Sequence, residues 1–200
     1  FYPKSIAVVG ASPNEDKSGS MWVKGLISAG FPGTVYPIGS SGGTILGLNI
    51  FPNLRLIPGR VDYVVVCIPR QSILELLDDC AAKKVKVVHF FTAGFSELSE
   101  GGHELEQRML RKAREGGFRI IGPNCIGVYC PENSIPYGPS SRIGVSGSVG
   151  LVSQSGGIAG KLMQIGVARH INYSKGISFG NGIDLDASDF LQYLAADPKT

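Results

Sequence analysis

The first 122 residues repeat one pattern: a short run of apolar, β-forming residues, a polar turn and, in most repeats, a segment with helical periodicity. The apolar runs are continuous rather than alternating, which is typical of parallel strands covered on both faces. Strands and helices that alternate in this way predict a doubly wound α/β domain with a parallel sheet. The predicted strands lie at residues 5–10, 34–38, 61–69, 85–91 and 118–122.

Three helices are expected between these strands, at about Met21–Ala29, from Ser72 onward and at about Gly101–Glu115. The second begins with Ser72 and Glu75 in the spacing of a capping box, in which the serine side chain accepts a hydrogen bond from the first helical turn. The residues expected to face inward from the third helix are Leu105, Met109, Leu110 and Ala113.

The composition changes after the fifth strand. Residues 131–148 are rich in proline, glycine and serine, which is typical of a connector. The pattern then restarts with two further strand–helix units, and the last helix is expected to be capped near Asp186. We predict a domain over residues 1–130, a linker over 131–148 and a second α/β domain that starts at 149 and runs to 200. Two such units are too few for a doubly wound domain, so the second domain is expected to be incomplete or completed by another chain.

Composition narrows the function classes. Hydrophobic residues make up 43% of the chain and charged residues 18%, which argues against disorder. The net charge is only +3 and the basic residues form no cluster, so no nucleic-acid partner is expected. No apolar run is long enough to cross a membrane, and no signal peptide is expected because the chain opens on a strand. Four cysteines without CxxC spacing and three scattered histidines indicate a cytoplasmic protein with reduced thiols and no metal site.

The first strand runs into the loop "GASPNEDKSG" and then into a helix. Such a strand–loop–helix turn favours phosphate, because free N–H groups and the helix dipole meet at the helix N-terminus. Gly10 and Gly19 allow close backbone approach, Ser12 and Ser18 offer hydroxyl groups, and Lys17 adds a positive charge. The alternative interpretation is a plain tight turn.

The residues beyond this loop bear on which ligand it takes. An NAD site usually has an acidic residue about 20 positions on, which binds the ribose. No acidic residue occurs between Asp16 and Asp62, so the sequence favours a ligand with more phosphate, either NADP or coenzyme A. The turn Gly39–Gly43, "GSSGG", adds hydroxyl groups at the same predicted sheet edge, unless it is an ordinary loop.

The later strand ends add further candidates. Phe91, Thr92 and Phe95 could line a channel for an adenine or a pantetheine arm, or they could simply pack in the core. In "GPNCIGV", Asn124 offers a polar group at the sheet edge. Cys125 could act as a nucleophile, but no adjacent base is visible, and a cysteine without one is usually inert.

The second domain opens with the turn "SQSGG", residues 153–157, at a predicted helix N-terminus. This turn could bind an oxyanion or a phosphate, or it could only cap its helix. Asp184, Asp186 and Asp189 could hold a metal ion, but a helix cap that uses Asp186 and Asp189 explains them more simply.

Several stretches occur in one fixed order, and the pair "GPNC" and "SQSG" on either side of a short linker is the most specific part of that order. Together they resemble the nucleoside-diphosphate-forming acyl-CoA synthetases, which include the ADP-forming acetate–CoA ligases and the α-subunit of succinyl-CoA synthetase. The stretches are "AVVGAS", "GFPGTVYPI", "GGTILGLNIFPNL", "VDYVVVCIP", "TAGFSE", "RIIGPNCIGV", "GLVSQSGGIA" and "ISFGNGIDLDASDFLQYLAADPKT".

The resemblance implies a Rossmann-like CoA-binding domain followed by the start of a flavodoxin-like ligase domain. In that family ATP or GTP phosphorylates a histidine, the phosphate passes to an acid, and the acyl phosphate reacts with the CoA thiol. The motif match implies that CoA binds Gly10, Ala11, Ser12, Ser18, Gly19, Ser41, Ile68, Pro69, Thr92, Ala93, Gly94, Asn124 and Cys125. It implies that Ser153, Gln154, Ser155 and Gly156 hold the phosphoryl group.

Two positions depart from the family pattern. Ser41 stands where the family usually has a lysine before two glycines, and Ala93 stands where the succinyl enzyme has a glutamate. The phosphorylated histidine is expected beyond Thr200. His89 is expected in the core, His103 on a helix surface and His170 in a loop.

The resemblance also implies partners: a small organic acid, and an ATP-grasp domain or β-subunit that brings ATP and Mg²⁺. The chain by itself is expected to bind CoA without completing a turnover. An oligomer is expected because apolar sheet edges need cover. Two alternatives stay open: a CoA-binding or CoA-sensing module without ligase chemistry, and an NADP-dependent oxidoreductase, for which the sequence offers no catalytic Tyr, Lys or His constellation.

Overall fold

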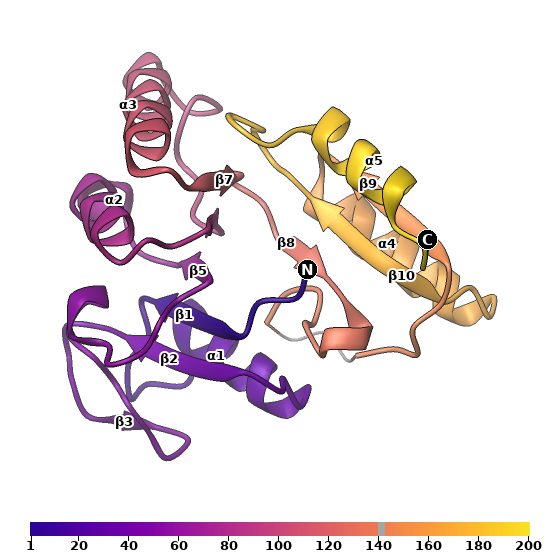
Figure 1. Cartoon of the computed structure of the whole chain (residues 1–200), viewed down its shortest axis with the longest axis horizontal. Helices are drawn as coiled ribbons and strands as arrows, with labels where there is room; N and C mark the ends of the chain where they lie inside the picture. Colours follow the sequence, from indigo (N-terminus) through magenta and orange to yellow (C-terminus); the bar gives the residue numbers. More distant parts are fainter. Residues whose placement is uncertain (140–142) are drawn as a thin grey trace.

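The computed structural model describes residues 1–139 and 143–200. Its first part is a five-stranded sheet in the order β2-β1-β5-β6-β7, and every neighbouring pair is parallel (Figure 1). This confirms the parallel sheet predicted from the continuous apolar runs. The strands are β1 Ser5–Val9, β2 Thr34–Ile38, β5 Tyr63–Val66, β6 Val87–Phe90 and β7 Arg119–Ile121.

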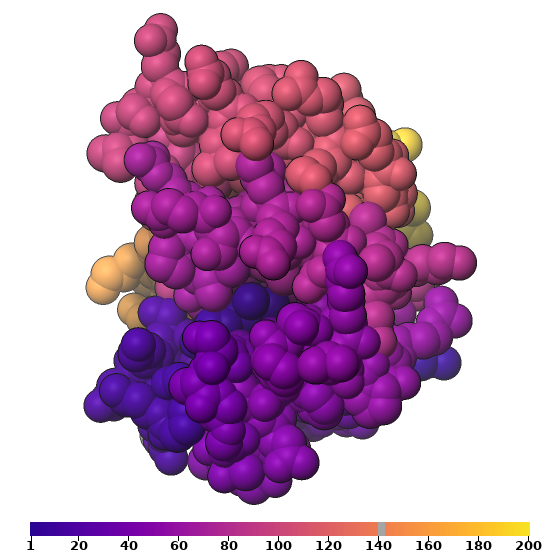
Figure 2. All heavy atoms as spheres, turned by 90° about the vertical axis from the view of Figure 1, so that its left-hand side faces the viewer, coloured from indigo at the N-terminus to yellow at the C-terminus, as the bar shows by residue number. Residues whose placement is uncertain are grey.

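Alternate residues of each strand enter two different cores. Ile6 and Val8 of β1 pack in one cluster with Trp22 of α1 (Ser18–Ser28). Ala7 and Val9 pack in the other, which α2 (Ile73–Ala82) and α3 (Glu100–Gly116) cover. Figure 2 shows the molecule from the side on which α2 and α3 cover the sheet. Helix α3 lies at the top, α2 lies below it, and the small hairpin of β3 (Thr44–Ile45) and β4 (Leu48–Asn49) lies at the bottom. Both faces of the sheet are therefore buried, as parallel strands require.

The helix boundaries differ from the sequence prediction in instructive ways. The structure starts α1 at Ser18, three residues earlier than expected. A short 3₁₀ turn (η2, Arg70–Ser72) precedes α2, and the Ser72 side chain caps nothing, so the predicted capping box is wrong. The reason is conformational: Ser72 has φ −97° and ψ 4°, whereas a capping residue needs extended backbone.

Helix α3 is capped instead by Ser99, whose side chain accepts a hydrogen bond from the N–H of Gly102. Met109 and Ala113 are buried as predicted, but Leu105 and Leu110 are only half-buried. Their place on the inner face is taken partly by Glu106, which is 4% exposed. A carboxylate buried to this degree needs hydrogen-bond partners.

The second part of the chain forms a three-stranded sheet in the order β8-β10-β9 (Figure 1). Its elements are β8 Gly127–Tyr129, β9 Val149–Ser153, β10 Tyr173–Ser178, α4 Gly156–Ala168 and α5 Ala187–Ala196. Strand β8 was not predicted, and it pairs antiparallel with β10 although it lies within the range 1–130. The predicted linker contains the 3₁₀ turn η3 (Pro131–Asn133), and its residues 140–142 lie outside the described residues.

The two sheets share one core. Ile177 of β10 and Phe190 and Leu194 of α5 belong to the same cluster as Ile6 and Val8 of β1. Below, the first region means residues 1–126 and the second region means residues 127–139 and 143–200. Nowhere in these described parts is there a helix long and apolar enough to cross a membrane.

Candidate functional site

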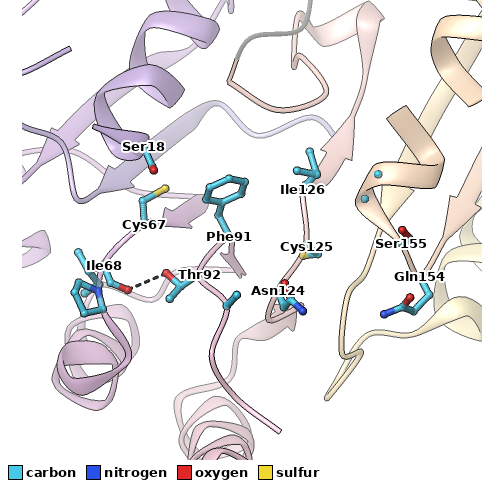
Figure 3. A pocket seen from close by; sticks show the side chains of 14 residues that line it. Ser18, Cys67, Ile68, Phe91, Thr92, Asn124, Cys125, Ile126, Gln154 and Ser155 are labelled. Carbon is cyan, nitrogen blue, oxygen red and sulfur yellow. Dashed lines mark hydrogen bonds between the residues drawn. The ribbon is translucent and has the colours of Figure 1, made fainter. Parts of the chain in front are cut away.

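Two adjoining hollows lie where the strands of the large sheet end. The inter-region cavity, of about 810 Å³, lies between the loops after β5, β6 and β7 and the turn before α4 (Figure 3). The β1–α1 hollow, of about 1010 Å³, lies along the loops that follow β1 and β2. Ser18, Cys67, Ile68 and Pro69 line both, so the two form one groove. Ligands of open α/β sheets bind at this edge.

The β1–α1 loop is packed tightly against the sheet. A Cβ atom at Gly19 would overlap the backbone of Gly10, and one at Gly10 would lie 2.6 Å from the carbonyl oxygen of Cys67. Gly10 also has φ +106°, a conformation that favours glycine. The two glycines therefore let α1 begin directly at the end of β1, and Gly19 lines neither hollow.

The hydrogen bonds of this loop show which donors remain for a ligand. The N–H groups of Gly10 and Ala11 both donate to the carbonyl of Ile38, at 2.9 Å, so the loop amides expected to bind phosphate are already bonded. The Ser12 hydroxyl closes the loop by accepting from the N–H of Asn14 at 3.1 Å. By contrast, no side chain caps the first turn of α1. The first amides of this helix are therefore backbone donors left free at the hollow.

Positive charge is sparse in the β1–α1 hollow. Ser41 lines it, as the sequence predicted, and contributes no positive charge. Among the described lining residues the one cation is Lys17, while Asp16, Glu75 and Asp79 are acidic. Asp79 is paired with Arg55 at 2.5 Å. An anion here would therefore rest mainly on the N-terminus of α1 and on Lys17.

The loops after β5 and β6 are tied together. The Thr92 hydroxyl donates to the carbonyl of Ile68 at 2.8 Å, shown as the dashed line in Figure 3. Thr92, Ala93 and Phe91 line the inter-region cavity. Phe95 does not, because it is fully buried beneath α3. Gly94 also lies outside both hollows; its carbonyl accepts from Arg70 at 2.8 Å.

The loop between β7 and β8 presents Asn124. Its backbone N–H donates to the carbonyl of Thr92 at 3.0 Å, while the structure gives its side-chain amide no hydrogen bond. Figure 3 shows this side chain facing Gln154 across the cavity. Cys125 beside it is 5% exposed, and its thiol points back to the carbonyl of Phe90. Burial raises the pKa of this thiol to about 12, so the thiol of Cys125 is protonated at neutral pH, which disfavours nucleophilic attack.

His89 supports this loop from below. Its Nε2 lies 3.2 Å from the carbonyl oxygen of Cys125, and a carbonyl can only accept, so Nε2 carries the proton. Burial lowers the pKa of His89 to about 4, although the hydrogen bond to Cys125 opposes this. The predicted core position of His89 is confirmed, but its hydrogen bond across 36 residues had no signal in the sequence. His103 and His170 are exposed on a helix and in a turn, as predicted.

The turn between β9 and α4 caps its helix and also borders the cavity. The Ser155 side chain caps α4 by accepting from the N–H of Ile158 at 3.3 Å. Gln154, Ser155 and Gly156 also line the inter-region cavity, whereas Ser153 does not. No charged side chain lines this cavity in the described residues. Negative charge near Ser155 would therefore be balanced by the N-terminus of α4 alone.

The aspartates of the second region have structural partners. Asp186 and Asp189 form a capping box at the start of α5, which confirms the predicted cap. Asp184 accepts from Arg119 at 2.9 Å and from the N–H of Ile120 at 2.7 Å. Within residues 1–139 and 143–200, no three His, Cys, Asp or Glu side chains lie close enough to hold a metal ion.

Most residues that the sequence nominated do converge on this groove. The exceptions are Phe95, which is buried in the core, and Gly19, Gly94 and Ser153, which support the loops of the groove without lining it. The predicted residues that line the groove are Gly10, Ala11, Ser12, Ser18, Ser41, Ile68, Pro69, Thr92, Ala93, Asn124, Cys125, Gln154, Ser155 and Gly156.

A parallel sheet with two helix N-termini at its strand-end groove defines an α/β domain that binds a nucleotide-like ligand. Comparison with known families makes this specific. A model described as a CoA binding domain matches residues 4–131, and one described as a succinyl-CoA ligase like flavodoxin domain matches residues 146–200. The chain therefore belongs to the CoA-binding domain family. The order of the two matched domains is the one that the resemblance to the nucleoside-diphosphate-forming acyl-CoA synthetases implies.

Individual proteins that are similar to this chain are consistent with the family match. The chain is 36% identical to the α-subunit of ADP-forming acetate–CoA ligase I of Pyrococcus furiosus, over 100% of this chain and 44% of that protein. It is also 36% identical to the ADP-forming 4-hydroxybutyrate–CoA ligase of Nitrosopumilus maritimus, over 99% of this chain and 28% of that protein. The chain therefore spans less than half the length of these relatives.

A solved structure shows the same architecture. It is the acetyl-coenzyme A synthetase 1 of Ca. Korarchaeum cryptofilum in complex with phosphate and ADP, with a TM-score of 0.94 and 37% identity. The match covers 100% of this chain and 43% of that one. The Rossmann-like and flavodoxin-like fold classes expected from the resemblance are thereby confirmed.

Proposed function

We propose that this chain is the CoA-binding part of an acid–CoA ligase that forms ADP or GDP. The observation that carries the proposal is the inter-region cavity, which opens the strand-end groove of the large sheet directly onto the N-terminus of α4. A ligand that lies along the groove therefore has one end at Lys17 and the first turn of α1, and the other end beside Ser155.

The proposed binding mode follows the groove. The diphosphate of CoA lies at the N-terminus of α1, where free helix amides and Lys17 favour negative charge. The pantetheine arm runs past Ile68 and Pro69 to Phe91, and the thiol reaches Asn124. This uncharged path is lined by apolar side chains and a few polar groups, as is usual for ligand sites.

The proposed chemistry takes place between Asn124 and Ser155. The CoA thiolate attacks the carbonyl carbon of an acyl phosphate, the C–O bond to phosphate breaks, and acyl-CoA and inorganic phosphate form. Negative charge grows on the departing phosphate, and the amides at the N-terminus of α4 stabilise it. The side chain of Asn124 is placed to orient the thioester carbonyl. In this reaction the chain positions the reactants and stabilises charge, and none of its own side chains acts as a nucleophile.

We also propose the partners. None of His89, His103 and His170 lines the groove, so the phosphohistidine belongs to a segment beyond Thr200, and ATP and Mg²⁺ come from an ATP-grasp domain or β-subunit. The exposed apolar residues Ile158 and Leu162 of α4 support assembly with such a partner. Alone, the chain binds CoA without turnover. The four free cysteines support a cytoplasmic location.

Isothermal titration with CoA, acetyl-CoA and NADPH tests the proposal. We expect CoA and acetyl-CoA to bind, and Asn124→Ala to weaken CoA about tenfold by removing the side-chain amide from the thiol end. Asn172→Ala, at an exposed position outside both hollows, is the matched control. Binding of NADPH without CoA would refute the proposal and favour a dehydrogenase domain.

A further inference from the structure

The loop between β10 and α5, residues 179–186, touches three loops that line the inter-region cavity. The N–H of Gly180 donates to the carbonyl of Gln154 at 3.1 Å, and the Gln154 side chain donates back to the carbonyl of Gly180 at 3.1 Å. The N–H of Asn181 donates to the carbonyl of Pro123 at 2.9 Å. One short segment thus bonds the turn before α4 and the loop after β7.

The approach at Gly180 is close. A Cβ atom there would overlap the carbonyl of Pro123 and lie 2.5 Å from that of Asn124, and Gly180 has φ +60°. Only glycine fits both the space and the backbone conformation. The loop is therefore pressed against the segment that presents Asn124 to the cavity.

The Asn181 side chain reaches the third loop, between β6 and α3. Its Nδ2 lies 2.7 Å from Oε2 of Glu97 and 2.7 Å from Oε1 of Glu106. A primary amide has two hydrogens, so it can serve both carboxylates at once. The Ser96 hydroxyl also donates to Glu106, at 2.9 Å. These bonds explain why Glu106 can be buried on the inner face of α3.

Glu97 links Asn181 to the cavity-lining loop after β6. Its Oε1 accepts from the N–H of Gly94 at 2.6 Å, and Gly94 follows Thr92 and Ala93, which line the cavity. Burial would raise the pKa of Glu97, but the hydrogen bonds from Asn181 and Gly94 outweigh it and lower the pKa. Glu97 therefore stays ionised at neutral pH and keeps accepting from both groups.

We propose that Asn181 is a positioning residue that, together with the neighbouring Gly180, holds the three cavity-lining loops of both regions in one arrangement for the ligand. It lines neither hollow, so it acts through Glu97 and Pro123 rather than by contact. Without the Asn181 amide, the carboxylates of Glu97 and Glu106 lose the donor that they share. The loop that carries Ala93 is then no longer held. The effect on CoA rests on the proposed function, whereas the effect on the loop does not.

Asn181→Asp tests this with a side chain of nearly the same shape. At pH 7.5 it places a third carboxylate against Glu97 and Glu106, and we expect CoA to bind at least tenfold more weakly than to the unchanged protein. At pH 5 we expect the introduced carboxyl, which lies against other carboxylates, to be protonated and to donate again, so the difference should shrink to about threefold or less. The loop holds two further charged groups: Asp184 is paired with Arg119, and Asp186 caps α5.

Taking the ratio of the two dissociation constants at each pH removes the titration of CoA itself. Asn172→Asp is the control for an added surface carboxylate. Recovery at pH 5 also shows that the variant is folded, since a misfolded protein would not regain affinity. A ratio near one at pH 7.5, or one that does not change with pH, would overturn the proposal.

A second measurement separates this proposal from the proposed function. Hydrogen exchange of the Gly94 amide, followed without ligand, should be at least tenfold faster in Asn181→Asp at pH 7.5, because its acceptor Glu97 loses its own anchor. If the unchanged protein binds no CoA but this amide is released, the proposed function fails and Asn181 still holds the loop. An unchanged exchange rate would overturn the positioning role.

Discussion

Two strand–turn–helix turns face the groove from opposite ends, and they treat their helix N-termini differently. At β1–α1 the glycines Gly10 and Gly19 bring the helix against the strand, and no side chain caps its first turn. At β9–α4 the Ser155 hydroxyl caps the helix, and Gln154 ties the turn to the loop after β10.

In the proposed binding mode, this difference corresponds to two kinds of anion site. The first turn is fixed within its own region and leaves amides free, which suits a phosphate that stays bound throughout a reaction, as the CoA diphosphate would. The second turn is hydrogen-bonded to the β10–α5 loop, and the Ser155 hydroxyl accepts from its helix N-terminus. A phosphate could replace this hydroxyl, which suits a group that binds for one step and is then released. Each prediction below alters one side of this comparison.

The largest effect is expected from Gly19→Ala. Its Cβ would overlap the backbone of Gly10, so α1 must move away from β1 and the first anion site is lost. We expect CoA affinity to fall at least a hundredfold and the free energy of unfolding to fall by about 1–3 kcal/mol, the usual cost of overpacking. Titration calorimetry and urea unfolding measure the two.

The matched control is Gly101→Ala, also at the second residue of a helix. A Cβ there meets nothing within 4 Å, so this variant should bind CoA normally and be slightly more stable because alanine favours helix. Equal CoA affinity in both variants would show that the close packing of α1 is not what forms the first site.

A smaller effect, on stability, is expected from His89, which supports the loop between β7 and β8 through the carbonyl of Cys125. Unfolded, its pKa is near the ordinary 6.5, and burial lowers it to about 4 in the folded protein. Between these values the unfolded state binds more protons, so the free energy of unfolding should decrease as the pH falls, by at most about 1.4 kcal/mol per pH unit.

His89→Gln isolates this contribution, because glutamine keeps an amide donor and does not titrate. Carboxylates also lose favourable contacts at low pH, so the quantity to compare is the slope of unfolding free energy against pH in the two proteins. The slope should be shallower in His89→Gln between pH 6.5 and 4. Identical slopes would mean that His89 does not remain neutral in the folded state.

What the sequence could predict follows from local chemistry. Continuous apolar runs such as the one that contains Tyr63–Val66 predicted the parallel sheet, and a parallel sheet fixes where its loops meet. This is why residues as distant as Ser12, Thr92 and Asn124 could be assigned to one edge. Ser155 follows β9 of the other sheet, and only the family resemblance brought it into the same site. The capping residues Asp186 and Asp189 were also readable, because a capping box acts over four neighbouring residues.

What the sequence missed depends on contacts between distant segments. Strand β8 is three residues long and exists because β10 pairs with it. Ser72 has the right spacing for a cap, but its backbone is held in a 3₁₀ turn. The carbonyl of Ile38 occupies the amides of Gly10 and Ala11, and Asn181 joins Glu97 and Glu106. No local pattern reports such pairings.

The smallest effect, and the most informative for the second turn, is expected from Ser155→Ala. Loss of a serine cap typically costs about 1 kcal/mol of stability. CoA affinity should change less than threefold, because Ser155 lies at the far end of the proposed binding path. In an assembled enzyme with its ATP-binding partner, the rate of acyl-CoA formation should fall about tenfold or more, since the hydroxyl no longer holds the N-terminus of α4 in place for phosphate.

Ser99→Ala is the matched control, because Ser99 caps α3 by the same type of bond and lines neither hollow. It should lose similar stability with normal acyl-CoA formation and normal CoA affinity. The two serines thus separate the loss of a cap from the loss of an anion site. If Ser155→Ala abolished CoA binding and left the phosphoryl steps intact, the two turns would have their assigned roles reversed, with the permanent phosphate at α4 and the transient one at α1.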